Sequence, residues 1–425
     1  MLLKSQRLKK EVHLQAIHKA PRLLHSWQSC GSLLISDIII HIYTSYIMSV
    51  DYHEDHLSNL DKNIALGEKI ASIHQTLKAH FPFIVRIAAA LYDEKTDTLK
   101  TYVHSSEENT PLVRYEAKLA EIPSLHGMLE QGQARVINNL SVFSDGGDRL
   151  HSKHIQAQGY HSSYTMPMYE RGAFFGFLFF NSYHSDQFTK SVLVRLSPFG
   201  HLIKLAIINE LKLMHNLLAT VKTARDFNHL RDDETCAHQD RMSRFARLIA
   251  QKVADKHGLT DEHIESIFIF SPLHDIGKMG IPDHILLKPH KLSDEEFVHM
   301  KTHTSKGRYF IDQLLENFSL EEMPHVDILR NITELHHEAL NGSGYPYGHK
   351  EKNIPIEARI AAVADRFDAL TSRRPYKHAW SNDEAFDLLK DMSGSILDPD
   401  CVNALLDCRE EIEAIQQQFG EDLLG

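Results

Sequence analysis

Hydrophobic and polar positions alternate along the first half of the chain in a manner that predicts β-strands. The predicted strands cover residues 83–92, 98–104, 134–138, 163–170 and 173–181. Arg171-Gly172 reads as the turn that joins the last two strands. Helical patterns cover residues 122–131 and 186–218. These elements together predict an α+β domain over about residues 60–215, after an amino-terminal helical extension of residues 1–59.

The second of these helical stretches carries an apolar repeat. Its members follow a 4-3-4-3 spacing and are Ile207, Leu211, Met214, Leu218 and Val221. This spacing is typical of a coiled-coil seam of about two heptads. We therefore expect a connector helix over about residues 190–230 that pairs in parallel with a second copy and makes a homodimer. The alternative is a helix that packs on its own domain.

The second half of the chain has helical periodicity and no strand pattern. Its clearest helices are predicted at residues 233–256, 325–340 and 356–371. Thr260 is a predicted helix cap, and Ser293 and Ser381 are each followed three residues later by glutamate, as in a capping box. The pattern predicts an all-α helical bundle over residues 225–425.

Imidazole and carboxylate side chains in this helical half form a candidate metal site. The candidate ligands are Glu234, His238, His274, Asp275, His303, His336, His337 and Asp365. A donor set without thiolates suits iron, manganese or zinc with open positions, rather than a closed structural zinc. Each candidate alone has an ordinary explanation: Glu234 and His238 are four residues apart, as in a surface pair, and Asp365 could be a buried hydrogen-bonded side chain.

Four separated stretches resemble the HD-GYP family and occur in that family's order. They read DETCAHQDR at 233–241, HDIGKMGIPD at 274–283, HHEALNGSGYP at 336–346 and ADRFDALTSRRPYK at 364–377. The resemblance covers about residues 225–400 and implies a metal-dependent phosphodiesterase that hydrolyses the bacterial messenger cyclic di-GMP. It implies that the candidate side chains are the ligands of a di- or trinuclear centre of iron or manganese. Glu234 stands where members with a third metal keep a glutamate.

The resemblance and the chemistry of the residues assign further roles. Asp275 is expected to bridge two metals, since a carboxylate offers one oxygen to each. Arg374 and Lys377 are expected to clamp phosphate oxygens, with the arginine binding in bidentate fashion. Lys278 is expected to meet the scissile phosphate or to stabilise the leaving group. The alternative for both lysines is a solvated surface position.

A glycine-rich loop follows His337 in the sequence. Gly344 gives this loop backbone freedom, and Tyr345 is expected to contact a guanine or a phosphate of the substrate. Asn341 stands where the family commonly has aspartate, and we expect a looser loop or altered substrate preference. Cys236 stands where glycine is common, and it is either a redox-sensitive thiol near the metals or an inert buried side chain.

The segment MPMYERGAFFGFLFFNS at 166–182, followed by a long helix, resembles the closing part of a GAF sensory domain. Such domains bind small ligands, such as cyclic nucleotides or tetrapyrroles, or only transmit a signal and dimerise. No cysteine lies between residues 31 and 235, which excludes a thioether-linked bilin on this domain. The ligand of the domain stays open.

Charge and cysteine content narrow the function classes. The 46 lysines and arginines against 57 aspartates and glutamates give a net charge of −11, which argues against binding of a nucleic acid polymer. The four cysteines, at 30, 236, 401 and 408, form no CxxC pair, which fits a reducing cytosol.

Residues 31–50 are the only stretch considered as a membrane anchor. Asp37 and His41 interrupt it, so a packed or interfacial helix is favoured over a spanning one. A further alternative is that translation begins at Met48.

Taken together, the sequence predicts a multidomain cytoplasmic signalling enzyme. A GAF sensor domain of α+β fold is joined by a long helix to an all-α HD-GYP bundle, which hydrolyses cyclic di-GMP to pGpG and onward to GMP. The alternatives are a module that binds cyclic di-GMP or a protein without turnover, a diesterase for another cyclic dinucleotide, and a di-iron oxygenase. Arg374 and Lys377 argue against the oxygenase, because it has no phosphate to bind.

Overall fold

The computed structural model describes residues 55–107, 114–140, 158–227, 236–372 and 379–420. In it, the segments of the first half with alternating hydrophobic and polar residues form one antiparallel sheet. The strands are β1 (Arg86–Asp93), β2 (Thr98–Ser106), β3 (Glu116–Lys118), β4 (Arg135–Ile137), β5 (Ser162–Glu170) and β6 (Ala173–Ser182). Their order is β3-β2-β1-β6-β5-β4. The turn between β5 and β6 is confirmed, and both of its residues, Arg171 and Gly172, have positive φ.

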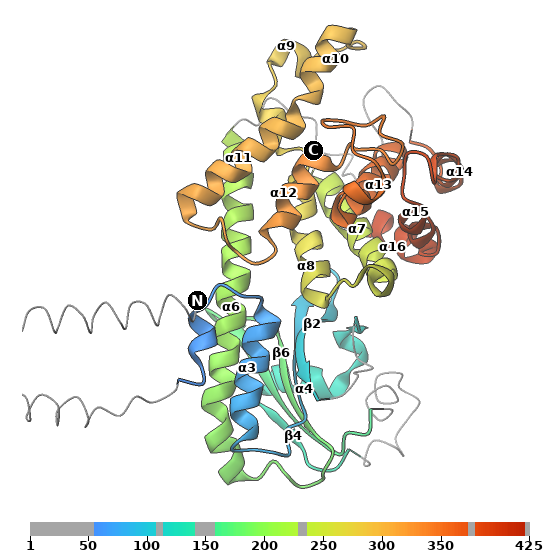
Figure 1. The fold of residues 1–425 in the computed structure, drawn as a ribbon. Helices are drawn as coiled ribbons and strands as arrows, with labels where there is room; N and C mark the ends of the chain where they lie inside the picture. The colour runs from blue at the N-terminus through green and yellow to red at the C-terminus, as the bar shows by residue number, and fades with distance from the viewer. Residues whose placement is uncertain (1–54, 108–113, 141–157, 228–235, 373–378, 421–425) are drawn as a thin grey trace, which may run out of the picture. The chain divides into compact units, whose positions relative to one another are not determined.

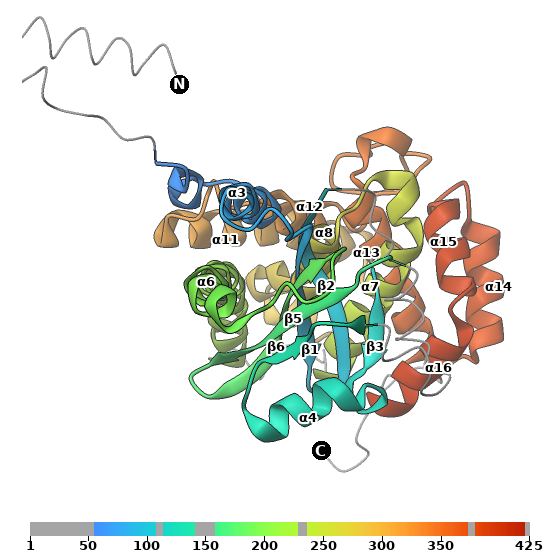
Figure 2. The same ribbon diagram turned by 90° about the horizontal axis from the view of Figure 1, so that it is seen from below.

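Helices cover both faces of this sheet. They are α3 (Leu66–Lys78), α4 (Pro123–Gln131) and α6 (Lys190–Phe227). Figures 1 and 2 show α3 and α6 side by side on one face, with α4 on the other. The sequence prediction missed α3 and the three-residue strand β3. The signal for α3 was present, because Leu66, Ile70, Ile73 and Leu77 have helical spacing and are all buried.

The predicted coiled-coil seam on α6 is wrong. Ile207, Leu211, Met214 and Val221 are at most 8% exposed and belong to the chain's own hydrophobic core, with Leu218 packed against it. Helix α6 contacts α3 and β5 of the sheet domain, and also α8 and η5 of the helical half. A heptad spacing indicates an apolar stripe on a helix, but it does not determine whether the stripe packs against the same chain or against a second copy.

Helix α6 is also apolar along much of its length. Its segment Lys190–Val221 is long and apolar enough to cross a membrane, with a mean hydropathy of 1.5. A single such helix is weak evidence, because core helices of soluble proteins meet the same criterion. The membrane candidate predicted at residues 31–50 and the alternative start at Met48 lie outside the described residues.

The second half is helical throughout its described residues, apart from short turns and isolated bridges, as predicted. Its α-helices are α7 (Cys236–His257), α8 (Asp261–Phe270), α9 (Asp283–Leu286), α10 (Asp294–Lys301), α11 (His303–Phe318), α12 (Val326–Leu335), α13 (Ile356–Thr371), α14 (Asn382–Met392), α15 (Pro399–Leu406) and α16 (Arg409–Gln418). Two 3₁₀ segments, η4 (Ser271–Leu273) and η5 (Ile276–Gly280), follow α8. The predicted cap at Thr260 and both capping boxes, at Ser293 and Ser381, are present. The predicted fold class, an α+β domain joined by a long helix to an all-α domain, is confirmed.

A buried ion network joins the sheet to the helical half. Lys100 of β2 lies 3.1 Å from Glu265 of α8, and these side chains are only 6% and 8% exposed. Arg247 of α7 donates to Glu265 at 2.6 Å and also to Glu116 of β3. Removing one member of such a buried pair typically costs roughly 3–5 kcal/mol, because its partner keeps an uncompensated charge. The network therefore fixes α7 and α8 against the sheet.

Candidate metal centre

Seven of the eight predicted ligands lie in described parts of the chain, and the fold gathers all seven. The atoms within each of two groups lie within 4.8 Å of one another. One group holds Asp275, His303, His336 and His337, and the other holds His238, His274 and Asp365. They come from α7, α11, α13, the end of α12 and the two-residue turn between η4 and η5. The eighth, Glu234, lies outside the described residues.

Backbone carbonyls orient three of the histidines. The Nδ1 atoms lie 3.0 Å from the Ser271 carbonyl for His274, 2.8 Å from the Met300 carbonyl for His303, and 2.9 Å from the Ile332 carbonyl for His336. A carbonyl oxygen only accepts hydrogen bonds, so each Nδ1 carries the proton. In the neutral ring, Nε2 then keeps its lone pair, which is the form that binds a metal.

Asp275 lies between the two groups and has one oxygen on each side. Its Oδ1 is 3.0 Å from Nε2 of His303, and its Oδ2 is 3.3 Å from Nε2 of His274. Burial opposes ionisation of Asp275, but Lys278 and the neighbouring histidines outweigh it and hold the pKa of this carboxyl well below its usual range. Asp275 is therefore ionised at neutral pH, as a ligand shared between two metals must be.

Burial also tunes the two adjacent histidines at the end of α12. It lowers the pKa of His336, although the Asp275 carboxylate opposes this. Burial, followed by the neighbouring His336, places the pKa of His337 well below its usual range. Both rings are therefore neutral at neutral pH, with lone pairs available.

A further observation also indicates that these residues fit a metal centre. Asp275 Oδ1, His303 Nε2 and His336 Nε2 are buried, and despite their short separations none of the three atoms makes a hydrogen bond of suitable geometry with a described residue. Buried polar groups are otherwise nearly always hydrogen-bonded. Together with the imidazole and carboxylate donors, this indicates that the atoms are arranged for a cation.

His238 is held by a carboxylate that the sequence analysis did not single out. Its Nδ1 lies 2.7 Å from Oδ2 of Asp368, a fully buried residue on α13. Arg241 donates to the other oxygen of Asp368 at 2.6 Å, and Ser372 donates to Asp368 at 2.9 Å. Burial raises the pKa of Asp368, but His238 and Arg241 outweigh it and keep the carboxyl ionised. The helical spacing of Asp365 and Asp368 was visible in the sequence, but their different partners were not.

Replacing Asp368 by asparagine is expected to weaken metal binding by about 10–100-fold, the usual effect of losing a carboxylate behind a metal-binding histidine. The measurement is metal content per chain during titration with a chelator. Ser372→Ala is the matched control, because it removes a hydrogen bond to Asp368 but keeps the carboxylate. Equal metal affinity in Asp368→Asn and the parent protein would show that His238 needs no such support.

The predicted glycine loop packs against the site. Tyr345 lies with its ring centre 4.8 Å from that of His337 and 6.2 Å from that of His303. A Cβ on Gly344 would lie 2.4 Å from the backbone nitrogen of Ala339 and 2.5 Å from the carbonyl of His337. Gly344 is therefore required for close packing, which brings Tyr345 beside the histidines. Its predicted contact with substrate stays a prediction.

Asn341, which stands where the family commonly has aspartate, still makes a hydrogen bond that holds the turn of the loop. Its side-chain oxygen accepts a hydrogen bond from the Ser343 backbone at 2.9 Å, and its own backbone nitrogen donates to Ser395 at 2.9 Å. An amide oxygen thus serves here as a carboxylate would. The expectation of a looser loop finds no support in these contacts.

Lys278 of η5 is within reach of the centre. Its Nζ lies 2.6 Å from Oδ2 of Asp275. Lys301, which the sequence analysis did not consider, lies with its Nζ 5.4 Å from the ring centre of Tyr345. Arg374 and Lys377 lie outside the described residues, as does the side chain of Cys236.

Known proteins similar to this chain match mainly its helical half. The sequence profile of the HD domain family matches residues 228–401. The cyclic di-GMP phosphodiesterase response regulator RpfG of Xanthomonas campestris pv. campestris is 43% identical over 189 residues, 44% of this chain and 47% of the relative. A cyclic di-GMP phosphodiesterase of Thermotoga maritima is 40% identical over 188 residues, 44% of this chain and 48% of the relative. The chain thus spans about half the length of these curated relatives.

Two further likenesses concern substrate and fold. The 3'3'-cGAMP-specific phosphodiesterase 2 of Vibrio cholerae serotype O1 is 34% identical over 205 residues, 48% of this chain and 36% of the relative. Among solved structures, a phycocyanobilin-bound GAF domain from a cyanobacterial phytochrome is similar at 15% identity and a TM-score of 0.29. The similar region covers 37% of this chain and 96% of the GAF domain structure. The evidence for the α+β domain is the sheet itself. Residues 228–401 of the helical half thus match the HD domain family and are similar to about half of each of these two cyclic di-GMP phosphodiesterases.

Proposed function

We propose that this chain is a metal-dependent phosphodiesterase that hydrolyses cyclic di-GMP. The observation that carries the proposal is Asp275, which lies between two groups of histidine and aspartate side chains with one carboxylate oxygen toward each. This arrangement stands in an HD domain whose named relatives are cyclic di-GMP phosphodiesterases. Iron or manganese is the proposed metal, because imidazole and carboxylate donors suit both.

The chemistry requires an activated water and compensation of negative charge. Metals held by the two groups would lower the pKa of a bound water and neutralise charge on the phosphodiester. The chain itself supplies three imidazoles of fixed orientation, since Nδ1 of His274, His303 and His336 donates to backbone carbonyls. Lys278 supplies positive charge where the leaving oxygen becomes negative. Tyr345 lies beside His337 at the edge of the site, and its proposed role is to stack on a guanine of the substrate.

Lys278→Met is expected to lower kcat by about 10²–10³-fold, the usual cost of losing one group that stabilises transition-state charge. Metal content is expected to stay unchanged, because Lys278 is not itself a metal ligand. The assay is steady-state hydrolysis of cyclic di-GMP, with metals counted on the same sample. Lys288→Met is the matched control, since Lys288 pairs with Glu296 of α10. If Lys278→Met turns over at the rate of the control, the lysine has no catalytic role.

Regulation by the amino-terminal domain is part of the proposal. Helix α6 contacts the sheet domain through α3 and β5 and the HD domain through α8 and η5, the segment that carries Lys278. A shift of α6 would therefore displace η5, which it contacts directly and which carries Lys278 beside the metal centre. We place this signalling enzyme in the cytoplasm, in line with its cysteine usage.

A second candidate substrate is 3'3'-cGAMP, because a relative specific for it is 34% identical to this chain. Both substrates present the same phosphodiester to the metal centre, so the choice depends on contacts with the bases. Comparing kcat/KM for the two dinucleotides under identical conditions decides between them. A higher value for 3'3'-cGAMP would replace cyclic di-GMP as the substrate but keep the diesterase proposal.

The experiment that tests the function is anaerobic incubation of cyclic di-GMP with Fe(II)- or Mn(II)-loaded protein, followed by product chromatography and metal counting. His274→Ala is the control variant and is expected to form no product. Three metals per chain with GMP as the end product would give Glu234 a ligand role, whereas two metals and pGpG would not. Tight binding without product would favour a binding module, and oxygen uptake would favour the oxygenase.

A further inference from the structure

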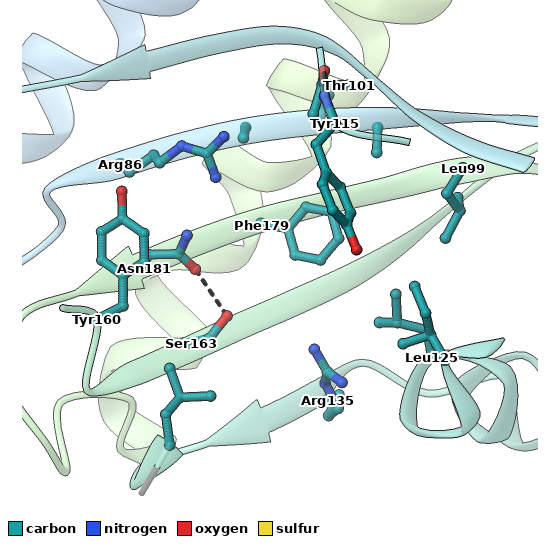
Figure 3. Close-up of a pocket in the computed structure, with 15 residues that line it drawn as sticks. Arg86, Leu99, Thr101, Tyr115, Leu125, Arg135, Tyr160, Ser163, Phe179 and Asn181 are labelled. Atoms are coloured by element: carbon teal, nitrogen blue, oxygen red, sulfur yellow. Dashed lines mark hydrogen bonds between the residues drawn. The ribbon is translucent and has the colours of Figure 1, made fainter. Parts of the chain in front are cut away.

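The amino-terminal domain contains a cavity of about 70 Å³ between the sheet and α4. Strands β1, β2, β4, β5 and β6 contribute to its wall, and none of its lining residues belongs to the metal centre. Most of the lining is apolar and includes Leu99, Leu125 and Phe179 (Figure 3). Two arginines also line it, Arg86 and Arg135, but none of the described lining residues is an aspartate or a glutamate.

Arg86 is the unusual residue of this cavity. It is the first residue of β1 and only 3% exposed, and its Nε has no hydrogen-bond partner among the described residues. No carboxylate in the described ranges lies within ion-pairing distance of it. Figure 3 shows its guanidinium directed into the cavity, above Asn181 and Tyr160. A guanidinium remains charged in proteins, and a buried charge is normally paired.

The surroundings supply only a remote counter-charge. Burial lowers the pKa of Arg86, and Tyr160 of the cavity wall, followed by the Asp261 carboxylate of α8, partly offsets this. Asp261, however, already accepts the backbone N–H of Arg114 at 3.1 Å. The cavity thus presents a desolvated cation that lacks a close acidic partner among the described residues.

Arg135 adds a second cation at another part of the wall. Its two terminal nitrogens donate to hydroxyl groups, at 2.6 Å to Ser124 and 3.1 Å to Thr165, and its Nε has no hydrogen-bond partner in the described part of the chain. Burial lowers its pKa to about 10, so it stays protonated at neutral pH. Two positive charges in a mainly apolar hollow favour an anion with an apolar part.

We propose that this cavity binds a short-chain organic carboxylate, with its carboxylate on Arg86 and its carbon atoms against Ala88 and Phe179, which face each other two residues along β1 from Arg86. A planar carboxylate matches the two-pronged donor geometry of a guanidinium. The volume limits the ligand to a few carbon atoms, since even an apolar cavity that accepts benzene measures about 150 Å³. A nucleotide or a tetrapyrrole is therefore too large for the cavity described here.

The position of the site connects it to the rest of the molecule. Leu99 and Thr101 of β2 line the cavity, whereas Lys100 between them makes the buried ion pair with Glu265 of the HD domain. Neighbouring residues of a strand point to opposite faces, so the cavity wall at Leu99 and Thr101 lies on the face of β2 opposite this ion pair.

The test uses the full-length protein with sodium butyrate as the probe and sodium chloride at equal ionic strength as the control. Isothermal titration calorimetry is expected to show one saturable site per chain. Arg86→Gln is expected to weaken butyrate binding at least tenfold, while its Tm without butyrate stays equal or rises, because an unpaired buried charge has been removed. An arginine with a purely structural role would instead lower the Tm.

Two further variants make the result specific. Ala88→Val narrows the cavity without touching either arginine and is expected to weaken butyrate at least tenfold. Arg195→Gln alters an exposed arginine of α6 and is expected to leave binding unchanged. The proposal is overturned if butyrate acts no differently from chloride, if Arg86→Gln binds it normally, or if inorganic phosphate binds as tightly as butyrate.

Discussion

Replacing Asp275 by asparagine is expected to abolish measurable hydrolysis of cyclic di-GMP and to release metal from the protein. The carboxylate is the shared element of the site, with Oδ1 beside His303 and Oδ2 beside His274. Asparagine keeps the shape but offers a neutral oxygen on one side and an N–H donor on the other. Losing about 4 kcal/mol of charge stabilisation corresponds to roughly a thousandfold loss of rate.

The measurement is metal content per chain together with the rate of product formation, both on the same preparation. Asp387→Asn is the control, because Asp387 lies on α14, is largely exposed and pairs only with the neighbouring Lys390 in the hydrogen bonds described. Circular dichroism and the Tm of the metal-free proteins show whether the fold persists. An Asp275→Asn protein with full metal content and normal turnover would contradict the assignment of this site.

Gly277→Ala is expected to be the most damaging substitution outside the ligands. Gly277 follows the His274-Asp275 pair by two residues and lies against the first turns of α11. A Cβ there would lie 1.7 Å from the carbonyl oxygen of His303 and 2.4 Å from the backbone nitrogen of Gly307. Backbone atoms cannot rotate away as a side chain can, so α11 must move and take His303 with it.

Overpacking of this kind typically destabilises a protein by about 1–3 kcal/mol. We expect a lower Tm and, in the protein that remains folded, loss of metal from the group that includes His303. Gly280→Ala is the matched control in the same segment, because its Cβ would meet the flexible Lys306 side chain at 2.9 Å. If both variants keep the parent's Tm and metal content, the close approach of α11 is not what sets the position of His303.

Local chemistry explains what the sequence determined. Alternation in residues such as 98–104 and the glycine turn after Arg171 specify strands and a hairpin within a few residues, so β2, β5 and β6 were predictable. The capping boxes at Ser293 and Ser381 likewise depend on contacts over three residues. The candidate metal ligands were selected by chemical type and motif, which also does not require the fold.

Contacts between distant segments account for what only the tertiary structure decided. The apolar repeat of α6 that begins at Ile207 packs in the chain's own core and not against a second copy. The spacing of the repeat alone does not distinguish these two arrangements. Asp368 supports His238 across 130 residues of chain, and Gly277 accommodates the start of α11. Only the folded sheet shows that Arg86 is buried beside a mainly apolar cavity and lacks an ion-pair partner among the described residues. The sequence thus determined which groups are available, and packing determined which atoms face one another.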